Sequence, residues 1–250
     1  MLLLVYMALD CCDAGDVATT AGSIRAQNRE RITVAILAAS RAQIAERGAN
    51  ELSLRAIARE LEMASSAIYR YFPSRDALLT KLIIDSYNSI ADAVEQSEAA
   101  VARDDILERY RTICRAVRTW SLANQHEFFL IYGTPAPGYA APTDTIAPAS
   151  RIGTLLIGLM TEATTTPGDD RAELAVSAAG AASLTPMRSQ VPPRVSDAEL
   201  LRGLGTFSAM FGAISFELSG QLHNVVDDSA VGRAAYYDAL IETWLQTLGW

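Results

Sequence analysis

The 250-residue sequence has few of the residues that bind metals, form disulfides or carry acid–base chemistry. Its three cysteines include the adjacent pair Cys11 and Cys12, so they form no disulfide framework and favour a reduced, cytoplasmic setting. One of its two histidines, His126, begins a His-Glu pair like that of metalloproteases, but no second histidine follows at the required spacing. The sequence also lacks a glycine-rich phosphate loop and a nucleophile elbow. We therefore expect no metal, no cofactor and no catalytic site. An all-α enzyme remains an alternative, although the sequence has no set of catalytic residues that would support it.

Alternating β-branched runs and long apolar stretches are scarce as well. Half of the residues are hydrophobic, which is enough for a sizeable core, and the nine prolines fall mostly in a few loops. The periodicity predicts an all-α protein, with a three-helix head on a larger helical body.

The first 23 residues do not have the features of a membrane or export segment. The opening apolar run ends at Leu9, whereas a membrane-spanning helix needs about 20 residues. No basic segment precedes it, and Asp10, Asp13 and Asp16 follow at once. We expect residues 1–23 to be a disordered leader or a wrongly assigned start, with a packed arm or an export signal as alternatives.

Charge is distributed unevenly along the chain. The net charge of −8 by itself argues against a nucleic-acid binder. Residues 24–81, however, contain ten basic and six acidic residues, whereas the remainder contains eleven basic and twenty-three acidic ones. A basic head on an acidic body is what a protein needs if it presents one end to phosphates.

Residues 52–79 have the layout of a helix-turn-helix. Ser53 is a candidate N-cap for a first short helix, whose apolar positions repeat at helical spacing. Glu62 to Ala64 form the expected turn, and Ser65 or Ser66 can cap a second helix reaching residue 72. Pro73 ends that helix, and Ser74 can cap the next.

This stretch resembles the tetracycline-repressor (TetR) family of bacterial transcription regulators. The resemblance rests on LSLRAIA from Leu52, AIYRYF from Ala67 and FPSRDALL from Phe72. Glu62 stands where the family usually has glycine, so this turn residue adopts either a helical or a mildly costly left-handed conformation. The resemblance implies a DNA-binding domain over residues 24–80, in which the second helix reads the major groove.

The candidate DNA-binding residues follow from that interpretation. Short side chains early in the second helix lie near base edges, while Arg55 and Arg75 contact the flanking backbone. The family pattern places Tyr69 and Tyr71 on phosphates, and Arg70 on a base or a phosphate. Tyr69 as a scaffold residue and Arg75 as a helix-bracing charge remain alternatives. The full set is Ser53, Arg55, Ser65, Ser66, Ala67, Tyr69, Arg70, Tyr71 and Arg75.

Residues 81–250 form the expected ligand-binding and dimerisation domain. Proline- and glycine-containing loops are predicted at residues 133–142, 164–170 and 185–195. We expect helices at residues 24–47 of the head and, in the body, at 81–102, at 105–124 as two helices, at 127–132, at 144–163, up to 184, at 196–225 and at 232–248.

The body resembles a TetR subgroup with a so-called WHG C-terminal domain, on the segments Trp120–Tyr139 and Phe207–Gly220. In the second segment Phe207 and Phe211 replace the Trp and His of the subgroup, while Gly212 is kept. Aromatic and sulfur side chains could line a ligand cavity, although each of them could equally be plain core. The candidate ligand-binding residues are Trp120, Asn124, His126, Phe129, Tyr132, Tyr139, Met160, Met210 and Phe211.

The last two helices carry too much apolar surface for one buried face, and the resemblance implies that they form a four-helix dimer interface. We expect a homodimeric transcription regulator that binds a palindromic DNA operator and is released by an apolar or aromatic small molecule. A DNA-binding regulator without an effector is the alternative.

Overall fold

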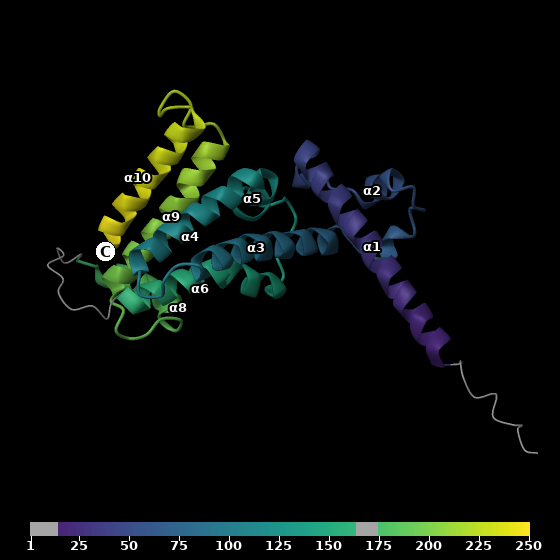
Figure 1. Ribbon diagram of the computed structural model, residues 1–250, viewed down its shortest axis with the longest axis horizontal. Helices are drawn as coiled ribbons and strands as arrows, with labels where there is room; N and C mark the ends of the chain where they lie inside the picture. Colours follow the sequence, from purple (N-terminus) through teal and green to yellow (C-terminus); the bar gives the residue numbers. More distant parts are fainter. Residues whose placement is uncertain (1–14, 164–174) are drawn as a thin grey trace, which may run out of the picture. The chain divides into compact units, whose positions relative to one another are not determined.

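The computed structural model describes residues 15–163 and 175–250, and within them every regular element is helical. Figure 1 shows these helices along the chain. The backbone separates into two compact units, Met1–Leu78 and Leu79–Trp250, with the division inside one continuous helix. Residues 1–14 of the expected leader and the expected loop at 164–170 lie outside the described part of the chain.

The head begins with α1 (Gly15–Arg47), which starts nine residues before the expected position. It ends at Gly48, whose φ of 83° confirms the predicted glycine terminus. A short 3-10 turn, η1 (Ala49–Glu51), leads into α2 (Leu54–Glu60). The Ser53 side chain accepts a hydrogen bond from the Ala56 amide, so the predicted N-cap is confirmed.

The second helix of the predicted helix-turn-helix is shorter than expected. Only η2 (Ile68–Arg70) is regular, as a 3-10 helix, and turns flank it from Ser65 to Tyr71. Neither predicted serine caps it, because Ala67 precedes it without a side-chain cap bond. The amides of this segment bond three residues back, which tightens the turn at the expense of α-helical geometry.

Several helices of the body have bounds that differ from the predicted ones. A single helix, α3 (Arg75–Ala99), starts at the Ser74 cap rather than at Lys81. One helix, α4 (Ile106–Ala123), replaces the two expected between 105 and 124, and α5 (Gln125–Tyr132) follows almost directly. The 3-10 turn η3 (Thr143–Thr145) precedes α6 (Ile146–Ala163).

The last third of the body holds four helices in the described residues. After α7 (Ala178–Ser183), the expected linker contains a short helix, α8 (Thr185–Arg188), with Pro186 in its first turn, a position that proline tolerates. Ser196 forms a complete capping box at the start of α9 (Asp197–Leu218), which ends seven residues before the expected Val225. The final helix is α10 (Ala230–Leu248).

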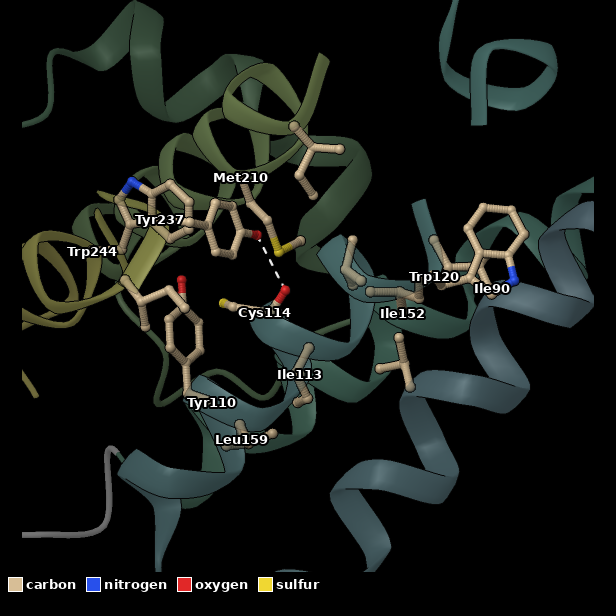
Figure 2. Packing of buried hydrophobic residues seen from close by; sticks show 14 of the residues in the cluster. Ile90, Tyr110, Ile113, Cys114, Trp120, Ile152, Leu159, Met210, Tyr237 and Trp244 are labelled. Atoms are coloured by element: carbon tan, nitrogen blue, oxygen red, sulfur yellow. Dashed lines mark hydrogen bonds between the residues drawn. The ribbon is translucent and has the colours of Figure 1, made fainter. Parts of the chain in front are cut away.

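Helix α4 is the centre of the body, since it contacts α5, α6, α9 and α10. Its inward side chains repeat every three or four residues, from Tyr110 through Ile113 and Val117 to Trp120. Figure 2 shows Tyr110 and Cys114 of α4 on the side of Met210, Tyr237 and Trp244, whereas Trp120 lies farther along α4, beside Ile90 of α3. The buried Tyr237 hydroxyl donates to the Cys114 carbonyl, 3.1 Å away, and burial raises the pKa of the Cys114 thiol to about 12. That thiol is therefore a packing group rather than a nucleophile.

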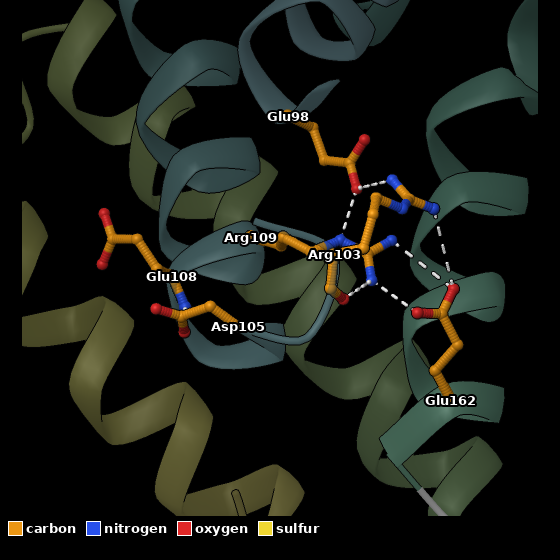
Figure 3. Close-up of polar contacts among 6 residues, drawn as sticks. All are labelled: Glu98, Arg103, Asp105, Glu108, Arg109 and Glu162. Atoms are coloured by element: carbon orange, nitrogen blue, oxygen red, sulfur yellow. Dashed lines mark hydrogen bonds and ion pairs between the residues drawn. The ribbon is translucent and has the colours of Figure 1, made fainter. Parts of the chain in front are cut away.

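A buried arginine joins three body helices (Figure 3). Arg109 of α4 is only 1% exposed. Its Nε donates to Glu98 of α3 at 2.5 Å, and its Nη1 donates to Glu162 of α6 at 2.5 Å. Arg103 donates to the same Glu98 carboxylate at 2.8 Å. The beginning of α4 is thus joined to α3 and α6 through a buried arginine and its paired carboxylates.

None of the helices in the described residues combines the length and the apolar character needed to cross a bilayer.

Candidate nucleic-acid interface

The segment after α2 turns back on itself through a left-handed residue. Glu62 has a φ of 54°, so the left-handed alternative predicted for this turn is the one adopted. The Met63 amide donates to the Ala58 carbonyl at 2.8 Å and closes the end of α2. We call residues 64–72 the reading segment. Ile68 and Phe72 anchor it, since both are buried.

The buried anchors leave the other side of the reading segment open. Tyr69 is 43% exposed, and Ser65, Ser66 and Arg70 are exposed as well. Ala67 and Tyr71 are half-buried. The segment therefore offers two hydroxyls, a phenol and a guanidinium on one short turn, which are donors suited to base edges and phosphate oxygens.

The flanking candidates differ in how free their side chains are. Arg55, in the first turn of α2, is exposed, whereas Ser53 uses its hydroxyl as the helix cap. The Arg75 Nη2 donates to the Ala49 carbonyl at 2.8 Å, so this arginine braces η1, in agreement with the alternative prediction for it. A phosphate contact by Arg75 would have to use the part of its guanidinium that these bonds leave open.

One contact to the reading segment was not predicted. Arg29 of α1 donates from Nη2 to the Arg70 carbonyl at 3.2 Å, and its guanidinium carbon lies 5.4 Å from the centre of the Tyr71 ring. The two ends of this contact are 41 residues apart in the chain. Arg29 lies in α1, and η1 and α2 separate it from the reading segment, so no local pattern in the sequence indicates this contact.

Most of the candidate ligand residues of the body already contact other side chains or the backbone of the protein. Tyr132 and Phe211 have ring centres 4.1 Å apart, and Phe129 packs against Phe128. Trp120 donates from Nε1 to Ser89, and the Asn124 amide donates to the Trp120 carbonyl. The Tyr139 hydroxyl forms a hydrogen bond with the Thr80 hydroxyl. Met210 is buried in the core, and His126 is exposed.

A cavity of about 250 Å³ lies elsewhere in the body, between α6, α8 and α9. Met160 is the one predicted ligand residue that lines it. Its walls are mainly apolar, with Ser150, Thr154 and Gln190 as the polar side chains. No local pattern in the sequence indicates this cavity, because its lining comes from three separate segments. Other lining residues include Leu156, Ile157, Met187, Leu200, Leu204 and Phe207.

The described residues hold no group of three or more His, Cys, Asp or Glu side chains placed to hold a metal ion.

Comparison with known families decides the classification of the chain. Residues 36–82 match the bacterial regulatory proteins of the tetR family, and residues 110–243 match the tetracyclin repressor-like C-terminal domain. The chain belongs to the TetR family. The family is one of bacterial regulatory proteins, and residues 36–82 are the part of this chain that matches its N-terminal domain.

Individual TetR relatives agree with this assignment. The HTH-type transcriptional regulators Rv1816 of Mycobacterium tuberculosis and Mb1846 of Mycobacterium bovis are each 46% identical to this chain over 123 residues. That region is 49% of this chain and 53% of each relative, so the chain spans about half the length of the curated relatives it matches.

Solved structures extend the likeness to both units. SCO4313, described as a regulatory protein, is 32% identical with a TM-score of 0.71, over 88% of this chain and 98% of that one. The TetR family transcriptional regulator PfmR from Thermus thermophilus has a TM-score of 0.54 at 18% identity, over 84% of this chain and 97% of that one. The second likeness concerns the fold alone.

Proposed function

We propose that this TetR-family protein is a repressor that binds a palindromic operator as a homodimer and leaves it when a small molecule binds the body. The observation that carries the proposal is the reading segment, in which buried Ile68 and Phe72 hold Tyr69 and Arg70 outward. Such a regulator acts in the cytoplasm, where bacterial DNA lies.

Sequence recognition is assigned to the exposed side of the reading segment. Ser65 and Ser66 are short enough for the backbone to approach base edges, and the Ala67 methyl can contact a thymine methyl. Tyr69, Tyr71 and Arg55 would contact phosphates, which fix the register of the head on the duplex. DNA from the region upstream of the gene should therefore bind more tightly than scrambled DNA, and Tyr69→Ala should lose most of that affinity in fluorescence anisotropy.

The outward faces of α9 and α10 support a homodimer. Gly205, Ala209 and Gly212 of α9 are exposed and lie on one side of the helix, and Phe216 beyond them is 56% exposed. Small residues allow a second helix to approach closely, and a two-fold pair of heads could enter successive major grooves. Sedimentation should give twice the 26.9 kDa of one chain, and Gly212→Glu should shift it towards the monomer.

The α6/α8/α9 cavity is the proposed effector site. Its apolar walls and few polar groups suit a small, neutral, apolar or aromatic molecule. Because coupling between two sites is reciprocal, operator DNA must weaken effector binding by the same factor by which the effector weakens DNA binding. Thr154→Phe, which fills the cavity from an exposed position, should abolish the response to the effector and keep DNA binding. A screen that returned only highly charged metabolites would count against this chemistry.

A second function, a regulator without an effector, has an observation in its favour. The aromatic residues around Tyr132 and Phe211 fill the space in which the sequence placed a ligand. If no apolar compound changes operator affinity, and wild type and Thr154→Phe behave alike throughout, this second function replaces the first.

A further inference from the structure

Helix α1 extends well beyond the part of the head that matches the family. The family match begins at residue 36, and Ile36 is also the first buried position in the part of α1 from Ile24 onward. All eight residues from Ile24 to Arg31 are exposed. This stretch carries three arginines and one acidic residue, Glu30. The helix starts at Gly15, so these arginines lie beyond its first two turns and the unfavourable dipole of the terminus does not act on them.

Arg29 ties this extension to the reading segment. Its Nη2 donates at 3.2 Å to the carbonyl of Arg70, the last residue of η2, and its guanidinium lies over the Tyr71 ring. A carbonyl at the end of a helical turn lacks an internal partner and attracts a cation. Since η2 is only three residues long, the reading segment depends on such outside contacts for its orientation.

Arg25 lies on the same side of α1, one turn farther out. Residues four apart share a helix face, and four residues advance the helix by about 6 Å. Arg25 is exposed. It lies on the face of α1 from which Arg29 contacts Tyr71, one turn nearer the start of the helix. A guanidinium one turn beyond a phosphate-contacting tyrosine is in position for the next phosphate along a strand, because phosphates on one strand are spaced by several ångströms.

We propose that Arg25 forms an additional site for the DNA backbone phosphate and that Arg29 is a positioning residue that orients the reading segment. The inference rests on the proposed DNA face, and it adds α1 to that face. Arg25 supplies affinity irrespective of sequence, since phosphate contacts carry no base information. Arg29 supplies discrimination, because it sets where Arg70 and Tyr71 stand.

The phosphate site is tested by the salt dependence of binding. Wild type, Arg25→Ala and Arg47→Ala are titrated onto a random-sequence duplex of about 30 base pairs at several salt concentrations in fluorescence anisotropy. Arg47 is the matched control, because it is an exposed arginine at the opposite end of α1. In Arg25→Ala alone, the slope of log K against log salt should be shallower by about 0.9 for each phosphate that is no longer neutralised, or about 1.8 per dimer.

The positioning role is tested with a substitution that keeps the charge. Arg29→Lys retains a cation but loses the planar fork that bonds the carbonyl and covers the ring. Its salt slope should match that of wild type, while its preference for the native upstream fragment over scrambled DNA should fall about two- to fivefold. Arg25→Ala should keep that preference.

Three outcomes overturn the inference. Equal slopes for Arg25→Ala and wild type remove the phosphate site, and an unchanged preference in Arg29→Lys removes the positioning role. If wild type shows no salt-dependent binding to any duplex, the DNA face itself is wrong and this inference falls with it. The first two results leave the proposed function standing, so the two failures are distinguishable. Circular dichroism melting of each variant checks that the head stays folded.

Discussion

Replacing the buried Arg109 by methionine should destabilise the body more than replacing any exposed charge does. Arg109→Met keeps an apolar stem of similar length, so the packing of that stem is largely retained. What is lost is the guanidinium between Glu98 and Glu162, which bonds to both. The Glu98 side chain is 5% exposed, so its charge cannot turn to water when its partner is gone.

Removing one partner of a buried ion pair typically costs about 3–5 kcal/mol, because the other charge stays buried. Here Arg103 remains 2.8 Å from Glu98 and still compensates part of its charge. We therefore expect the lower end of that range, about 3 kcal/mol, for Arg109→Met. Arg111 is the matched control, since its ion pair with Glu242 is at the surface, and Arg111→Met should cost at most about 1 kcal/mol.

The assay is urea unfolding followed by circular dichroism, with the free energy of unfolding compared at equal denaturant slope. The double variant Glu98→Gln/Arg109→Met removes the stranded charge, so it should be more stable than Arg109→Met alone. If Arg109→Met costs no more than Arg111→Met, the network contributes nothing beyond an ordinary surface pair, and the reasoning is refuted.

Three further predictions concern caps, the turn and acid. Ser53→Ala removes the α2 cap and should lower the unfolding free energy by about 1 kcal/mol in urea titrations. An unchanged midpoint would show that the 3.4 Å hydrogen bond from the Ala56 amide to Ser53 does not stabilise the protein. Glu62→Gly relieves a left-handed residue and should stabilise the protein by up to about 1 kcal/mol in the same titrations, so a loss of stability would contradict the strain. The hydrogen bond from Arg109 lowers the pKa of Glu162 from its ordinary 4.5, so its stabilisation is present above that pH and is lost as the pH falls through the lower folded value. The free energy of unfolding of Glu162→Gln should therefore depend less on pH below 4.5 than that of wild type. Identical acid-unfolding curves for the two proteins would contradict a stabilising ion pair between Arg109 and Glu162.

Helix ends that depend on hydrogen bonds between nearby residues were predicted correctly from the sequence. Ser53, Ser74 and Ser196 all act as the caps that their positions indicated, and Gly48 ends α1. Each depends on hydrogen bonds within four residues, which a sequence displays directly.

Elements whose form depends on tertiary contacts were predicted less well. The sequence from Ser65 to Phe72 suits a short α-helix, yet η2 adopts 3-10 geometry between the buried anchors Ile68 and Phe72. A segment of one or two turns gains little from helix propensity, so packing decides its geometry.

Dependence on tertiary contacts also explains why the predicted ligand residues of the body do not line a cavity together. Tyr132 and Phe211 were predicted as cavity walls because they are aromatic, but they are 79 positions apart and their contact follows from how α5 meets α9. Whether aromatic residues surround a space or fill it depends on helix spacing, which no single segment encodes.

The central claim, that the reading segment binds DNA and selects its sequence, is tested most directly by fluorescence anisotropy of the full chain on its own upstream DNA and on scrambled DNA, at two salt concentrations. We expect tight, salt-sensitive binding that prefers the native fragment and collapses in Tyr69→Ala, while the melting temperature of that variant stays that of wild type. Equal, weak binding of both DNAs by wild type, or full binding by Tyr69→Ala, would contradict it.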